Sequence, residues 1–195
     1  MTYSLTRVSA PAASFLTLDE AKRQVFYTGT AQDTHIQSLV DTAVEMLDGP
    51  RGLLGRSIIT QQWELKLDSF FSPAIRLPLG PVSAIDSVIY VDENGSTQTL
   101  ASSVYTLDES HGVHYLALAY NQQWPNTRRQ TASVTITYTA GYGAASAVPD
   151  GVKQLAKYVF AEMYYQRQMT RDNFAKDAVV EALVGLHGLH GFGNV

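Results

Sequence analysis

The chain has 195 residues, of which 45% are hydrophobic and 16% are charged, with a formal net charge of −4 and no cysteine. The hydrophobic share supports a packed core and argues against disorder, and the low charged share indicates a surface partly buried against partners. Disulfides, thiolate metal sites and cysteine nucleophiles are excluded, and a mildly acidic chain lacks the concentrated basic surface of a general nucleic-acid binder.

Two helices are predicted in the first part of the chain. Thr17-Leu18-Asp19-Glu20 has the pattern of a capping box, in which Thr17 and Glu20 satisfy each other's free backbone N–H groups. A second helix is predicted from a cap at Asp33 or Thr34 to Gly49-Pro50. Its apolar residues recur at helical spacing and are Ile36, Leu39, Val40, Ala43, Val44 and Leu47.

The hydrophobic period changes to two after Ser57. Residues 59–67 alternate so that one face is mostly apolar, which predicts a long strand with Trp63 on its core-facing side, and residues 134–140 alternate strictly. Asn94-Gly95 is a strong hairpin signal because these residues tolerate a positive φ. Further strands are predicted at 85–91, 97–100, 104–107, 113–118 and 134–140. Locally connected antiparallel strands of this kind are typical of a small sandwich or barrel-like module.

Two more helices are predicted after the strands. Pro149 occupies a favoured first-turn position of the third helix, and a fourth helix is predicted from about Asp172. The predicted fold class is therefore α+β, with a four-helix core of two N-terminal and two C-terminal helices that carries an inserted antiparallel β module. The predicted parts are an N-terminal helical part at 1–56, the β insertion at 57–143, and the C-terminal helices with a Gly/His-rich tail at 144–195, which pack with 1–56 as one helical core.

Catalytic and cofactor-binding patterns are missing from the sequence. His187 and His190 have helical spacing, but the surrounding glycines oppose a helix and no carboxylate completes a metal site. Gly141-Tyr142-Gly143 lacks the third glycine of a dinucleotide fingerprint, and no Gly-x-Ser-x-Gly elbow occurs. No apolar run approaches the roughly 18–20 residues of a membrane helix. The sequence therefore predicts no catalytic residue, no metal, no cofactor and no membrane partner.

The candidate functional residues are those that could contact another protein. Trp124 lies in a polar loop and is either an interface anchor or part of a loop folded over the core. The pair Arg128-Arg129 could meet phosphate, a carboxylate on a neighbouring chain, or only water. Aromatic anchors are also possible at Tyr164 and Tyr165. In the glycine-rich tail, we expect an arm that becomes ordered on a neighbour through Leu186, Leu189 and Phe192.

Four stretches together resemble the head–tail connector, or adaptor, family of long-tailed double-stranded DNA bacteriophages, prophages and gene transfer agents. The first stretch is 16–22, and the second is the helix at 36–47 followed by 54–65. The third contains Trp124-Pro125 and Arg128-Arg129 and leads into 134–143. The fourth is Val148-Pro149 with the helix that continues through 165–167. The resemblance extends from about residue 16 to about residue 169. Two departures are a nearly uncharged 28–33 segment, where the family often has an acidic run, and the extra C-terminal helix with its Gly/His tail.

The resemblance implies a structural head-completion role without a reaction or cofactor. Such proteins form a homo-oligomeric ring, usually dodecameric, beneath the portal protein of the capsid. The ring extends the channel through which double-stranded DNA passes without sequence recognition, and it docks stopper, tail-completion or tail-terminator proteins. The expected location is the head–tail neck of a virion or phage-like particle, after synthesis in the bacterial host cytoplasm. A tail-side structural protein, such as a tail terminator or tail-completion binding module, is the alternative.

Overall fold

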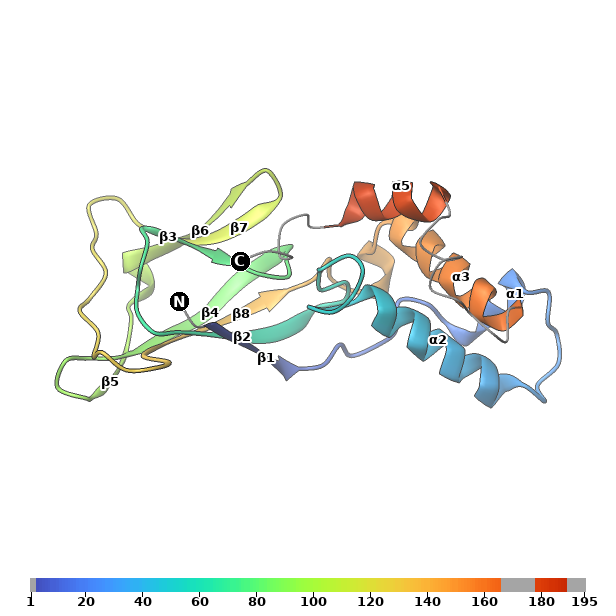
Figure 1. Ribbon diagram of the computed structural model, residues 1–195, viewed down its shortest axis with the longest axis horizontal. Helices are drawn as coiled ribbons and strands as arrows, with labels where there is room; N and C mark the ends of the chain where they lie inside the picture. Colours follow the sequence, from blue (N-terminus) through green and yellow to red (C-terminus); the bar gives the residue numbers. More distant parts are fainter. Residues whose placement is uncertain (1–2, 166–177, 189–195) are drawn as a thin grey trace. The chain divides into compact units, whose positions relative to one another are not determined.

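Two units make up the computed structural model, which describes residues 3–165 and 178–188 (Figure 1). The β unit contains the described residues up to Pro11 together with Thr60–Gly141. The helical unit contains Ala12–Ile59 and the described residues from Tyr142 onward. Each unit is thus assembled from two separate segments of the chain.

The β unit consists of two antiparallel sheets. In the five-stranded sheet the order is β1 (Tyr3–Ser9), β2 (Gln61–Leu67), β8 (Val134–Ala140), β4 (Val82–Val91) and β5 (Thr97–Thr99). In the three-stranded sheet the order is β3 (Ala74–Leu77), β7 (Val113–Leu118) and β6 (Tyr105–Ser110). A 3₁₀ turn, η1 (Ser102–Val104), precedes β6.

The core of the β unit follows from the alternation of β2 and β8. Both strands bury every second residue, and their register pairs Leu65 with Ile136 and Trp63 with Tyr138. Because successive side chains of a strand point to opposite faces, one face is apolar and the other carries Thr135, Thr137 and Thr139. The Tyr138 hydroxyl donates a hydrogen bond of 2.9 Å to the Pro78 carbonyl oxygen, and burial raises the pKa of Tyr138.

The helical unit contains α1 (Leu18–Gln24), α2 (Asp33–Leu47), α3 (Asp150–Tyr165) and α5 (Ala178–His187), with a 3₁₀ turn, η2 (Ala145–Ala147), before α3. Its core is formed by α1, α2 and α3 with the segments that flank them, because these parts of the chain supply all its described buried apolar side chains. The largest of them are Leu16, Ile36, Leu47, Leu54, Ile58, Leu155 and Phe160. Leu183 and Val184 of α5 are only half-buried against this core.

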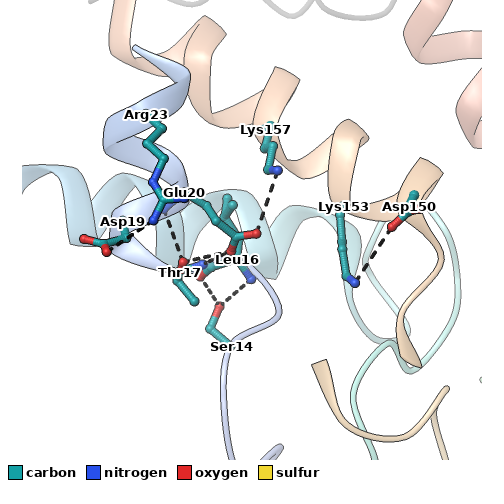
Figure 2. Close-up of polar contacts among 9 residues, drawn as sticks. All are labelled: Ser14, Leu16, Thr17, Asp19, Glu20, Arg23, Asp150, Lys153 and Lys157. Carbon is teal, nitrogen blue, oxygen red and sulfur yellow. Dashed lines mark hydrogen bonds and ion pairs between the residues drawn. The ribbon is translucent and has the colours of Figure 1, made fainter. Parts of the chain in front are cut away.

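The capping box that opens α1 is present as predicted, and it connects α1 to α3 (Figure 2). The Thr17 backbone N–H donates to Glu20 Oε2 at 3.0 Å, and the Glu20 N–H donates to Thr17 Oγ1 at 3.2 Å. Lys157 of α3 lies 3.8 Å from Glu20 Oε1. Burial raises the pKa of Glu20, but the Thr17 hydrogen bonds and the nearby lysines Lys157 and Lys153 together hold it below its ordinary value.

Replacing Thr17 with alanine is expected to lower the free energy of unfolding by about 1 kcal/mol at neutral pH, because the Glu20 N–H loses its acceptor. Chemical denaturation followed by circular dichroism would measure this loss. Thr28→Ala, at an exposed threonine outside any helix, is the matched control and should change stability little. Equal losses in both variants would contradict the role of the cap.

The predicted four-helix core with an inserted β module is wrong, although the α+β class holds. The described residues form eight strands in two antiparallel sheets alongside four α-helices. The strand β1 precedes the first helix and forms the edge of the five-stranded sheet, so that sheet is not made from one inserted segment. On the helical side, α1 has only seven residues, and the described side chains of α5 lie outside the buried core.

These differences have local physical causes. Nearly every residue of β1 is exposed, so its sequence carries no clear two-residue hydrophobic pattern. The short strand β3 lies between Pro73 and Pro78, and prolines so close together read in a sequence as breaks rather than as the ends of a strand. The predicted cap of α2 is also wrong, because Gln32 precedes this helix and makes no capping hydrogen bond with its side chain.

Candidate partner-binding site

An open groove of about 700 Å³ lies on the β unit, where three segments meet. One segment follows β2, one is the turn between β4 and β5, and the third is the loop before β8. The groove is lined by Asp68, Ser69, Phe70, Glu93 and residues 124–131. It therefore contains three of the residues predicted to contact partners: Trp124, Arg128 and Arg129.

An aromatic stack forms one part of the groove. The rings of Phe70 and Trp124 lie parallel, with centroids 4.7 Å apart and an interplanar angle of 6°. Tyr90 meets Phe70 edge-on at 6.2 Å. The Trp124 indole N–H donates a hydrogen bond of 2.8 Å to the Ser72 carbonyl oxygen. Trp124 is consequently half-buried in a fixed orientation, with part of its surface still accessible.

The loop before β8 has no regular secondary structure but is held by hydrogen bonds. Ser133 is buried, and its hydroxyl lies 2.6 Å from the Arg128 carbonyl oxygen and 3.1 Å from that of Gln130. The Arg128 N–H donates to the Val91 carbonyl oxygen of β4 at 3.0 Å. Asp68 accepts a bond of 3.1 Å from the Ala132 N–H. These contacts order the loop and thereby preorganise the groove.

The turn between β4 and β5 supplies the remaining wall. The Asp92 carboxylate accepts hydrogen bonds from the Gln98 side chain and from the backbone N–H groups of Ser96 and Asn94. Together with the Gly95 N–H, these donors favour the ionised form and hold the pKa of Asp92 below its usual range. The Arg128 guanidinium lies against this turn, because a Cβ added at Gly95 would be 2.5 Å from Arg128 Nη1.

The charges at the groove are mixed in sign. Arg128 and Arg129 are exposed, and within the described part of the chain neither guanidinium forms an ion pair. Asp68 and Glu93 lie in the same lining. A stacked aromatic pair flanked by both signs of charge suits a polar protein segment better than a purely anionic ligand.

The other predicted contact residues belong to the helical unit. The Tyr164 hydroxyl lies 3.3 Å from Gln32 Oε1, and its ring meets Tyr165 edge-on at 5.4 Å. Tyr165 and Leu186 are exposed. Leu189 and Phe192 lie outside the described residues. The structure thus brings Trp124, Arg128 and Arg129 together in one groove. Tyr164 and Tyr165 are neighbours at the end of α3, and Leu186 lies on a different helix, α5.

Sequence reasoning missed Asp68, Phe70 and Glu93. The only available signals were a Phe70-Phe71 pair directly after a predicted strand and the position of Glu93 next to the Asn94-Gly95 turn. In the described ranges, no group of three or more His, Cys, Asp or Glu residues is placed to hold a metal ion. Among the helices described, none has the length and apolar character needed to cross a membrane.

No family model matches the chain, and no curated protein matches it. Solved structures do match. A chain from the neck of an empty gene transfer agent particle, computed with C6 symmetry, aligns with a TM-score of 0.77 at 21% identity and covers 98% of both chains. The chain shares its fold with a gene transfer agent neck protein.

Two further matches come from native gene transfer agent particles. One is a chain of the virion, with a TM-score of 0.77, 21% identity, and coverage of 97% of this chain and 98% of that one. The other is a chain of the neck computed with C12 symmetry, with a TM-score of 0.73, 22% identity and coverage of 98% of both chains. The likeness therefore spans both units rather than one of them.

Proposed function

We propose that this chain is a structural protein of the neck of a gene transfer agent or related phage-like particle. The observation that carries the proposal is the fold match to neck chains over 98% of both sequences. A shared motif or a shared single unit would leave much of either chain uncovered. The proposed location is accordingly the particle itself, and the proposed role is structural rather than enzymatic.

Within the neck, we propose that the protein is the adaptor. Copies form a homo-oligomeric ring beneath the portal protein, extend the DNA channel, and dock a stopper or tail-terminator protein. The matching necks were computed with C6 and C12 symmetry, which supports a closed ring, and twelve copies agree with the resemblance found in the sequence. A net charge of −4 also suits a channel through which DNA slides, because a strongly basic lumen would retain it.

The groove on the β unit is the proposed docking surface for a protein of the neck. Its aromatic stack offers contact area, and Arg128 and Arg129 offer donors that no described carboxylate occupies. Aromatic and arginine side chains are enriched among the residues that contribute most to protein interfaces. Tyr165 and Leu186 are proposed contacts on the helical unit, because both are large and exposed.

Negative-stain electron microscopy tests this assignment with the purified full-length chain, alone and mixed with the portal of the same particle. We expect a ring stacked coaxially on the portal. The sample without portal shows whether the ring forms alone or only on its partner. A bare portal, with rings of the chain intact beside it, would contradict the adaptor role. The tail-side alternative would then be tested with tail tubes in the same assay.

A further inference from the structure

Phe26 is the most unusual exposed apolar residue of the helical unit. It follows α1, its backbone has φ of 55°, and 90% of its surface is exposed. The left-handed region is disfavoured for bulky side chains and is usually occupied by glycine or asparagine. A large aromatic in this conformation and in water is disfavoured twice, by its backbone and by its exposure.

The local hydrogen bonds show why the backbone adopts this conformation. The Phe26 N–H donates to the Arg23 carbonyl oxygen at 3.3 Å, and the Tyr27 N–H donates to that of Lys22 at 3.0 Å. This is a Schellman motif, in which the residue after the helix normally is glycine. The motif explains the left-handed residue, but it does not explain why that residue is phenylalanine.

The residues on both sides of Phe26 are held against the helical unit. Val25 is buried in the helical core, and Tyr27 is half-buried. The Tyr27 hydroxyl accepts a hydrogen bond of 3.2 Å from the Gln32 N–H, and the Lys22 ammonium lies 5.7 Å from the centre of its ring. The backbone at Phe26 is therefore anchored on both sides, while the Phe26 side chain itself is exposed.

The surface beside Phe26 carries no net charge, because the charged residues around it are paired: Lys22 with Asp33 at 2.7 Å, and Arg23 with Asp19 at 3.5 Å. Residues 28–32 are Thr-Gly-Thr-Ala-Gln, and all five are exposed. An aromatic residue beside a neutral rim has the composition of an interface centre, from which charged residues are depleted. Backbone strain that persists at such a place points to function rather than to stability.

We propose that Phe26 is an anchor that inserts into an apolar part of a second copy of this chain. Every copy carries a net charge of −4, so copies approach each other most favourably through surface that has no net charge, as at Phe26. The inference rests on the proposed ring. In a ring the contact is heterologous, and the surface that receives Phe26 is a different patch of the neighbouring copy.

The test compares full-length Phe26→Gly with the wild type by sedimentation velocity over a dilution series and by thermal unfolding. The midpoint of self-association should move to a concentration about tenfold higher or more, as expected when an aromatic anchor is removed. The melting temperature should stay equal or rise by about 2–4 °C, since glycine adopts the positive φ without strain. A structural role would instead lower the melting temperature.

Three variants separate the side chain from the backbone. Phe26→Asn also relieves the backbone and should lose association, whereas Phe26→Trp keeps an aromatic anchor and should retain it. Tyr120→Asn is the matched control, because Tyr120 is 99% exposed but belongs to the β unit. If Phe26→Gly formed rings at the same concentrations as the wild type, this inference would be overturned, but the proposed ring would not be contradicted. A wild type that stays monomeric at every concentration and on the portal would overturn both.

Discussion

Replacing Phe160 with alanine is expected to lower the free energy of unfolding by about 3–5 kcal/mol, the range for removing a large buried aromatic side chain. Phe160 is completely buried in the helical core, and its ring lies 6.0 Å from that of Tyr164. The close packing of protein interiors means that surrounding side chains fill such a cavity only in part. Urea denaturation followed by circular dichroism would measure the loss.

Tyr158→Ala provides the matched control for this substitution. Tyr158 lies on the same helix, α3, but its side chain is 40% exposed. Its replacement also removes a large aromatic side chain, and it should cost much less because it opens no interior cavity. If the two variants lost similar stability, the packing of α3 against α1 and α2 would need to be revised.

Replacing Trp124 with alanine is expected to reduce the number of tailed particles about tenfold or more, if the groove docks a neck protein as proposed. The substitution removes the ring that stacks on Phe70 and the N–H that binds the Ser72 carbonyl oxygen. Truncation of a central interface tryptophan commonly costs 2 kcal/mol or more of binding free energy. Electron microscopy of particles made by cells that carry only the variant would give the ratio of tailed to tailless heads.

Two variants distinguish loss of docking from loss of folding. Trp124→Phe retains a ring above Phe70 but lacks the donor to the Ser72 carbonyl oxygen, so the number of tailed particles should fall less than with Trp124→Ala. Tyr120→Ala alters an exposed aromatic residue of the same loop that makes no described ring contact, and tailing should be unaffected. If particles that contain Trp124→Ala carried tails as often as wild-type particles, the proposal that the groove is a docking surface would be contradicted.

Local patterns in the sequence predicted those parts of the fold that depend on near neighbours. The capping box at Thr17 is confirmed, and Gly95 has the positive φ expected of the hairpin turn. The strand predicted at 134–140 is confirmed as β8, and the apolar stripe of α2 lies in or against the core. In each case the determining interactions lie within a few residues, where propensity and periodicity are informative.

The parts that were not predicted depend on contacts between distant segments. The strand β1 is held mainly by backbone hydrogen bonds to β2. Such bonds do not depend on which side chains β1 carries, so its exposed residues show no hydrophobic pattern. The candidate site shows the same limit. Trp124 was recognisable as an unusual residue in a polar loop, but its stacking partner Phe70 lies far from it in the chain. The positive φ of Phe26 could not be predicted from the sequence. Glycine is the usual residue in this conformation, and a phenylalanine gives no indication of it.

The division of each unit between two chain segments has a consequence for synthesis on the ribosome. The strand β1 leaves the ribosome well before its partner β2, which begins at Gln61. The strand β8, which covers the other edge of β2, begins only at Val134. Similarly, α2 packs on α3, which begins at Asp150. The core of the β unit therefore closes only after β8 has been made, and the core of the helical unit only after α3 has been made, although chains with separate domains commonly fold them one after another. The first segment of each unit must therefore wait, unfolded or only partly folded, until the second segment has been synthesised.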